Sequence, residues 1–273
     1  TYFLRFSYTE EVSLSKTAVK EQVICSVDLG INTDAVCSIM CADGTILGRK
    51  FINFSSDKDQ LYHVLGRIRR FQREHCSRQV QSRWGYAKRL NMELSRKIAT
   101  EITKYAVEYQ ADVIVMEHLN FQNTTDKTSK RKKKSRSMRL HLWKAQTVQD
   151  IVENKAHRLG IHIARVCAWG TSRLAFDGSG KVLRGKDSTK TNNNYSLCEF
   201  QNGKIYHCDL NASYNIGARY FIREIRKSIP VTEWQCIAAK VPECMKRSTC
   251  TLSTLRNLCS ALYEPSYNGT AIA

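Results

Sequence analysis

The fold of this chain is decided near its start, by residues 22–54, which read QVICSVDLGINTDAVCSIMCADGTILGRKFINF. The stretch contains three runs rich in β-branched and apolar residues, at 22–28, 35–40 and 45–54. Asp43-Gly44 separates the second run from the third, and Asp-Gly between two apolar runs is a strong signal for a β-hairpin. These residues therefore predict three successive antiparallel strands.

Beyond this stretch the chain alternates between helical and strand patterns. Apolar residues recur at helical spacing over 61–71, 87–109, 140–159 and 209–227. Compact apolar runs typical of strands occupy 113–117 and 161–166. Three antiparallel strands followed by helical crossovers to parallel strands predict an α/β fold, a mixed β-sheet of RNase H-like topology flanked by helices. Residues 170–207, rich in Gly, Ser, Asn and Lys, predict an irregular insert before the last helix, whereas residues 231–273 show no interpretable pattern.

The composition points to a basic protein with a polyanionic partner. The 273 residues include 43 Lys+Arg and 25 Asp+Glu, which gives a formal net charge of +18. An excess of this size favours nucleic acid as the partner. No apolar run approaches the roughly 20 residues that a membrane span requires, so no membrane association is predicted. Eleven Cys without a secretory signal favour a reducing compartment.

Three carboxylates stand where predicted elements begin or end. Asp28 closes the first strand, Glu117 closes the fourth, and Asp209 opens the last helix. The first and fourth strands of the predicted sheet are parallel neighbours, so their carboxylates meet at one edge, and the last helix can bring its first turn over them. Taken singly, the three have simpler interpretations as a turn residue, a solvated strand end and a helix N-cap. Their coincidence favours a shared site.

Such a site predicts metal-dependent phosphodiester chemistry. Three converging carboxylates repel one another unless a cation lies between them, and hard oxygen ligands suit Mg²⁺ first and Mn²⁺ second. Two such ions about 3.5–4 Å apart can activate a water molecule and stabilise the leaving oxygen of a phosphodiester. The predicted catalytic and metal-binding residues are therefore Asp28, Glu117 and Asp209.

Basic residues gather in two segments. In the first, a helical region, only Glu74 opposes the cations, and Trp84 and Tyr86 are interleaved with them. This composition favours a nucleic-acid-facing surface over a merely solvated helix face. The predicted contacts there are Arg67, Arg69, Arg70, Arg73, Arg83, Lys88 and Arg89. The second segment follows the Glu117 strand as a predicted phosphate-contacting loop, with Lys130, Arg131, Lys132, Lys133, Lys134, Arg136 and Arg139.

Three motifs in register carry a family resemblance: VDLGIN at 27–32, VIVMEHL at 113–119 and CDLNASYNIG at 208–217. They resemble the three RuvC motifs of the TnpB (OrfB) proteins, transposon-encoded relatives of type V CRISPR effectors. The resemblance covers roughly residues 20–228. It implies an RNA-guided, Mg²⁺-dependent DNA endonuclease with one RuvC site, acting with guide RNA on DNA in the prokaryotic cytoplasm at the nucleoid.

The insert departs from the family pattern. TnpB proteins normally carry a four-Cys zinc ribbon between the second and third motifs. Here Ala175 and Gly178 stand where the first Cys pair belongs, and Gln201 replaces the partner of Cys198. One Cys of four cannot close a structural site, so no zinc is predicted. A hairpin at Asn202-Gly203 is expected to hold the insert instead.

The resemblance also implies a missing N-terminal half, because 27 residues precede Asp28. We expect residues 1–21 to be a remnant of a wedge-like domain, 22–228 to be the nuclease domain with the insert 170–207, and 229–273 to be a tail of unknown role. Two alternatives remain. One is a truncated, catalytically silent nucleic-acid-binding remnant. The other is an actin-like or sugar-kinase fold, in which residues 176–180 (FDGSG) would be a phosphate loop rather than a turn.

Overall fold

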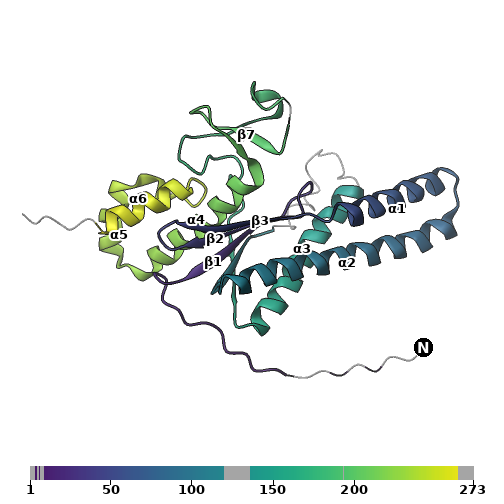
Figure 1. The fold of residues 1–273 in the computed structure, drawn as a ribbon, viewed down its shortest axis with the longest axis horizontal. Coiled ribbons are helices and arrows are strands. Elements are labelled where there is room, and N and C mark those ends of the chain that lie inside the picture. The colour runs from purple at the N-terminus through teal and green to yellow at the C-terminus, as the bar shows by residue number, and fades with distance from the viewer. Residues whose placement is uncertain (1–3, 5, 7–8, 120–135, 193, 264–273) are drawn as a thin grey trace, which may run out of the picture.

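The computed structural model describes the chain except for residues 1–3, 5, 7–8, 120–135, 193 and 264–273. Its centre is a five-stranded sheet in the order β3-β2-β1-β4-β5 (Figure 1). The strands are β1 (Val23–Asp28), β2 (Ala35–Cys41), β3 (Ile46–Ile52), β4 (Val113–Glu117) and β5 (His162–Val166). β1 pairs antiparallel with β2 and parallel with β4, and β5 pairs parallel with β4. The predicted mixed sheet, with its first and fourth strands as parallel neighbours, is confirmed.

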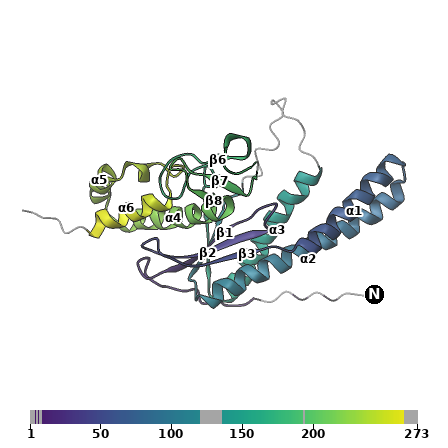
Figure 2. The same cartoon turned by 45° about the horizontal axis from the view of Figure 1, so that its top comes forward.

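Helices cover both faces of this sheet (Figures 1 and 2). They are α1 (Ser55–Arg73), α2 (Ser77–Glu108), α3 (Arg136–Arg158), α4 (Cys208–Ser228), α5 (Val231–Lys240) and α6 (Leu252–Tyr263). Because side chains alternate along a strand, β1 sends Cys25 and Val27 into the core beneath α2 and α3, and Ile24 into the core beneath α4. No helix among the described residues is long and apolar enough to cross a membrane.

Small buried residues let α4 lie close against the sheet. Ser38 of β2 donates a hydrogen bond to Ser213 of α4 at 2.9 Å, and Ser26 of β1 lies 2.9 Å from the Ser38 hydroxyl. A Cβ on Gly217 would come within 2.8 Å of the end of the Met40 side chain and 3.1 Å of the Ser26 hydroxyl, so α4 packs closely on the sheet at this point. These contacts hold α4 close against β1 and β2.

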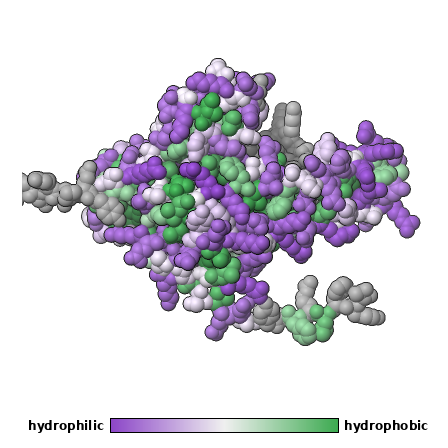
Figure 3. Space-filling view, viewed as in Figure 1, coloured by the Kyte–Doolittle hydropathy of each residue, from purple (hydrophilic) through white to green (hydrophobic). Residues whose placement is uncertain are grey.

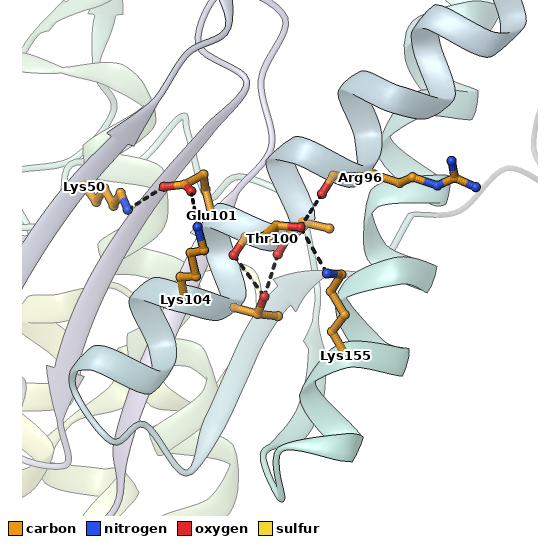
Figure 4. A network of polar contacts seen from close by, with 8 residues as sticks. Lys50, Arg96, Thr100, Glu101, Lys104 and Lys155 are labelled. Atoms are coloured by element: carbon orange, nitrogen blue, oxygen red, sulfur yellow. Dashed lines mark hydrogen bonds and ion pairs between the residues drawn. The ribbon is translucent and has the colours of Figure 1, made fainter.

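The helices on the other face are tied to the sheet and to each other by polar contacts. Lys50 of β3 forms an ion pair with Glu101 of α2 at 2.9 Å, and Lys155 of α3 donates to the Thr100 hydroxyl of α2 at 3.0 Å (Figure 4). Lys104, one turn from Glu101, lies 3.5 Å from the same carboxylate. These contacts fix α2 between β3 and α3.

The α1–α2 hairpin extends from the sheet as a long arm whose surface is mostly hydrophilic (Figures 1 and 3). A small core of Leu61, Val64, Ile68 and Ala87 holds its two helices together. The sequence placed the start of the second helix near residue 87, but α2 begins at Ser77. Its first turns were missed because they are mostly polar, and apolar periodicity is weak in a helix that packs on one neighbour alone.

The insert is more regular than predicted. It contains a three-stranded sheet in the order β6-β7-β8, made of Leu183–Arg184, Leu197–Glu199 and Ile205–His207. The expected hairpin is present, with Gly203 at a φ of 82° between β7 and β8. The insert packs around a buried cluster of Ala175, Cys198, Phe200 and Cys208. The sequence did not predict these short strands, because strands of two or three residues are too short to leave a period in the sequence.

Residues 231–263, in which the sequence showed no pattern, fold against α4. They form α5, a short 3-10 turn (Pro242–Met245) and α6. Leu252, Leu255 and Leu258 of α6 are buried in the same core as α4 and β1. This part of the predicted tail is thus packed into the body of the protein.

Candidate active site at the carboxyl edge of the sheet

The three predicted carboxylates lie at one edge of the sheet. Val27 pairs with Met116, so Asp28 and Glu117 end two adjacent parallel strands. Asp209 is the second residue of α4, and a Cβ on Gly30 would lie 3.7 Å from its Oδ2 atom. The turn that follows Asp28 therefore runs beside Asp209. All three side chains are partly buried.

Their electrostatics reflect this proximity. Burial, followed by the charges of Glu117 and Asp209, raises the pKa of the Asp28 carboxyl well above its usual range, against an opposing effect of Arg184 in the insert. Burial also raises the pKa of Glu117. The Thr171 hydroxyl, which donates to Glu117 Oε1 at 2.6 Å, and the charge of Arg219 offset part of that rise. The site therefore concentrates negative charge that its surroundings compensate incompletely.

The three carboxylates are suitable ligands for a divalent metal ion, although they are not arranged as a ready-made metal site. Within the described ranges, no three His, Cys, Asp or Glu side chains are close enough to form a ready-made metal site. The three carboxylates nevertheless offer the hard, anionic oxygen ligands that Mg²⁺ and Mn²⁺ prefer. Burial and then repulsion by Glu117 and Asp209 raise the pKa of Asp28, and a cation between the carboxylates would relieve the repulsion.

A buried ion pair holds the loop that follows Asp28. Asp34, which is 1% exposed, accepts from Lys144 Nζ of α3 at 2.8 Å and from the backbone N–H of Phe54 at 2.9 Å. The Gly30 N–H in turn donates to the Asp34 carbonyl at 3.3 Å. Sequence analysis missed both Asp34 and Lys144. A Lys on the apolar face of α3 is the signal that could have found the pair, since such a residue is rarely buried without a partner.

Two asparagines of α4 hold the segment that leads into the insert. Asn211 accepts from the Phe176 N–H at 2.8 Å and donates to the Leu174 carbonyl at 2.9 Å. Asn215 donates to the carbonyls of Thr171 and Leu174, each at 2.9 Å. Both asparagines were quoted in the third motif, but no role was predicted for them. Their contacts fix Thr171, and through its hydroxyl they support Glu117.

The first group of predicted cations lies on the α1–α2 arm. Arg67, Arg69, Arg70, Arg73, Lys88 and Arg89 are exposed and Arg83 is partly so. Arg70 pairs with Glu74 at 2.9 Å, and Arg83 lies over the ring of Phe71 at 4.9 Å. Trp84, which stands among these cations in the sequence, is partly buried and packs against the small core of the arm.

The second group is described in part. Residues 130–134, which contain the run of Lys and Arg, lie outside the described residues. Arg136 and Arg139 belong to the first turns of α3, which begins four residues before the predicted start at 140. They are therefore helical rather than part of a loop. The polar character of residues 136–139 concealed these turns from an analysis based on apolar spacing.

Comparison with known proteins shows which solved structures share the fold of this chain. No protein-family model matches the chain, and no curated protein matches it. Among solved structures it is similar to a Cas12f1–sgRNA–target DNA complex, with a TM-score of 0.52 and 20% identity over 71% of this chain and 49% of that one. It is also similar to a CRISPR-Cas12f ternary complex, with a TM-score of 0.51 and 18% identity over 76% and 40% of the two chains. The chain thus spans half or less of the Cas12f chains that it matches, and it shares an α/β fold with that part of them.

Proposed function

We propose that this chain is the nuclease portion of an RNA-guided DNA endonuclease of the TnpB (OrfB) type, built on an RNase H-like RuvC fold. The observation that carries the proposal is the meeting of Asp28, Glu117 and Asp209 at the carboxyl edge of β1 and β4. The three motifs and the fold shared with Cas12f complexes support it. Guide RNA and DNA are the partners that follow from this assignment.

In this proposal Asp28, Glu117 and Asp209 hold Mg²⁺ or Mn²⁺. When bound, the metal supplies an activated water and a stabilised leaving oxygen at the scissile phosphodiester. The remaining work belongs to the chain. The Thr171 hydroxyl keeps Glu117 oriented and favours its ionised form. The Asp34–Lys144 pair fixes the loop after Asp28, and the packing of α4 on the sheet fixes Asp209.

The exposed cations of the α1–α2 arm are proposed to contact phosphates. Arg67, Arg69, Arg73, Lys88 and Arg89 are exposed and, within the described part of the chain, none is in an ion pair. Each neutralised phosphate steepens the dependence of binding on salt by about 0.7–0.9 log units. Binding is therefore expected to weaken sharply at moderate salt.

The proposal is tested by cleavage of labelled single- and double-stranded DNA with Mg²⁺ or Mn²⁺. Wild-type chain is compared with Asp28→Asn and with the matched control Asp59→Asn, whose carboxylate is exposed on α1. We expect cleavage that requires the metal, is lost in Asp28→Asn and is retained in Asp59→Asn. Equal cleavage by the wild-type chain and Asp28→Asn would exclude the proposed site.

One observation favours a second candidate, a catalytically silent nucleic-acid-binding protein. The described carboxylates do not form a ready-made group of three metal ligands. The same assay separates the two candidates, because a silent protein binds DNA without cleaving it at any metal concentration.

The nucleotide-binding alternative loses its main support. Residues 176–180 form a turn as predicted, in which the Ser179 N–H donates to Asp177 Oδ1 at 3.0 Å and Gly178 has a φ of 81°. The Phe176 side chain packs in the aromatic cluster of the insert. This segment is therefore occupied by internal contacts rather than open for a phosphate.

A further inference from the structure

Arg219 of α4 is a buried cation that joins two distant segments of the chain. Its side chain is 5% exposed, and no described carboxylate lies within ion-pair distance of it. It donates instead to four backbone carbonyls, those of Cys167 at 2.6 Å, Trp169 at 2.9 Å, Ser248 at 3.1 Å and Cys250 at 3.2 Å. A buried charge is costly unless it is compensated, and these carbonyls provide the compensation. The backbones of 167–169 and 248–250 are therefore held in one arrangement.

The first of these segments borders the candidate active site. It continues through Gly170 to Thr171, whose hydroxyl donates to Glu117 at 2.6 Å. Two residues of extended chain span at most about 7 Å, so the backbones of Trp169 and Thr171 lie no farther apart than that. A Cβ on Gly170 would lie 3.3 Å from the Ser248 carbonyl, which shows that the two segments touch.

The same two segments also carry exposed aromatic and basic side chains. Trp169 is 66% exposed although its carbonyl is fixed by Arg219. Lys246 and Arg247, which immediately precede Ser248, are exposed as well. Across the residues that the structure describes, Trp169 has no ring partner, and neither Lys246 nor Arg247 forms an ion pair. We call Trp169, Lys246 and Arg247 the Trp169 rim.

The chemistry of this rim indicates its occupant. An exposed indole and two exposed cations on segments that touch offer a stacking face together with charges for phosphate, the combination that binds single-stranded nucleic acid. Bases in a duplex already stack on their neighbours and have no free face for the indole. The net charge of +18 favours the same class of partner.

We propose that the Trp169 rim binds a single strand of nucleic acid where it reaches the carboxylate site, with Trp169 stacked on a base and Lys246 and Arg247 against phosphates. The inference rests on the proposed function and assigns a substrate-binding surface to it. Because the rim combines residues 169 and 246–247, it gives the C-terminal segment a part in substrate binding.

The test measures binding by fluorescence anisotropy, in EDTA, of labelled single-stranded DNA, single-stranded RNA and duplex DNA of one length. The variants are Trp169→Ala and the double variant Lys246→Gln/Arg247→Gln. The controls are Tyr195→Ala, which removes a ring that is 62% exposed, and Lys16→Gln/Lys20→Gln, which removes two exposed charges near the opposite edge of the sheet.

Loss of stacking on the Trp169 ring is expected to weaken single-strand binding by about 5- to 150-fold in Trp169→Ala and to leave duplex binding nearly unchanged. The double variant should reduce the salt slope by about 1.4 log units, or about 0.7 for each phosphate. Whether the loss is larger with DNA or with RNA identifies the strand that the rim holds.

Normal single-strand affinity and an unchanged salt slope, in variants that melt at the wild-type temperature, would overturn the role proposed for the Trp169 rim. The proposed function would survive that result if the wild-type chain still cleaves DNA. Absence of all nucleic-acid binding by the wild-type chain would overturn both.

Discussion

Thr171 and Glu117 are linked by a hydrogen bond of 2.6 Å that joins the insert to the end of β4. Thr171 is itself buried, and Asn215 of α4 holds its carbonyl at 2.9 Å. Glu117 is thereby supported by a residue 54 positions away, which α4 holds in place. The candidate site is thus built by three elements: the sheet, α4 and the start of the insert.

Thr171→Val is expected to impair cleavage most strongly at low pH. Removing the hydroxyl takes away a hydrogen bond that lowers the pKa of Glu117, so that pKa rises further. The acid limb of the pH–rate profile should move upward by about one to two pH units, since a hydrogen bond to a charged group is worth about 1.5–3 kcal/mol. Thr171→Ser retains the hydroxyl and should keep the wild-type profile; coincident profiles for Val and Ser would contradict the role given to this bond.

Asp28→Asn is expected to stabilise the metal-free protein at neutral pH. The pKa of Asp28 is raised in the folded state. The protonated carboxyl therefore contributes stability below the unfolded pKa of about 3.9, and this contribution is lost as pH rises through the folded pKa and the buried group ionises. Relief of roughly 1 kcal/mol corresponds to a Tm increase of about 2–4 °C in a chain of this size. Calorimetry in EDTA should show the gain at pH 7.5 and its disappearance near pH 3. A lower Tm for Asp28→Asn than for Asp59→Asn at pH 7.5 would refute this account.

Arg219→Met is expected to destabilise the protein by roughly 3 kcal/mol or more. The substitution leaves four carbonyls without their donor, and each buried unsatisfied acceptor costs about 1–3 kcal/mol, part of which water can recover. Backbone amides near 168–171 and 248–254 should also exchange hydrogen faster. The matched variant Arg223→Met, one turn further along α4, removes one carbonyl contact at 2.8 Å and a partly exposed ion pair with Glu224, and should cost less. Equal losses of unfolding free energy in the two variants, measured by denaturant unfolding, would show that Arg219 has no special role.

Gly30→Ala is expected to abolish cleavage while leaving a folded protein. A Cβ there would lie 2.5 Å from the Thr33 carbonyl, so the loop that follows Asp28 and lies beside Asp209 must move. Gly66 of α1 has nothing within 4 Å of its Cβ position. Gly66→Ala should therefore stabilise the helix by about 0.5–1 kcal/mol and preserve cleavage. Full activity in Gly30→Ala would contradict the position assigned to this loop.

The purified protein is expected to contain no stoichiometric zinc. Ala175 and Cys198 belong to an apolar cluster with Phe200, which stabilises the insert by packing rather than by metal ligation. Elemental analysis should find zinc well below one equivalent, and EDTA should leave the Tm unchanged. One bound zinc per chain would defeat this prediction.

The central sheet could be predicted because its signals are local. β1 to β5 are apolar runs bounded by turns, and Asp43-Gly44 marks the hairpin between β2 and β3. Asp28 and Glu117 could be predicted to meet because parallel neighbouring strands bring their carboxyl ends to one edge. The first turns of α2 could not, since a helix that projects into solvent carries few apolar residues.

The contacts that support the carboxylates could not be predicted from the sequence, for a different reason. Arg219 binds carbonyls about 30 to 50 residues away, and every residue type has a carbonyl, so nothing in the sequence marks the partners. Asn211 and Asn215 also bind backbone groups. α5 and α6 were missed because helices of 10 and 12 residues make only about three turns, too few for their apolar spacing to stand out in the sequence.

The most direct test of the account is the rate of metal-dependent DNA cleavage under single-turnover conditions for Asp28→Asn, Glu117→Gln, Asp209→Asn and the double variant Asp28→Asn/Glu117→Gln. If the three carboxylates act as one site, each single variant should lose at least about 10³-fold in rate, and the double variant should lose little more than the worst single one. Cleavage at the wild-type rate by any of the three single variants would contradict the account.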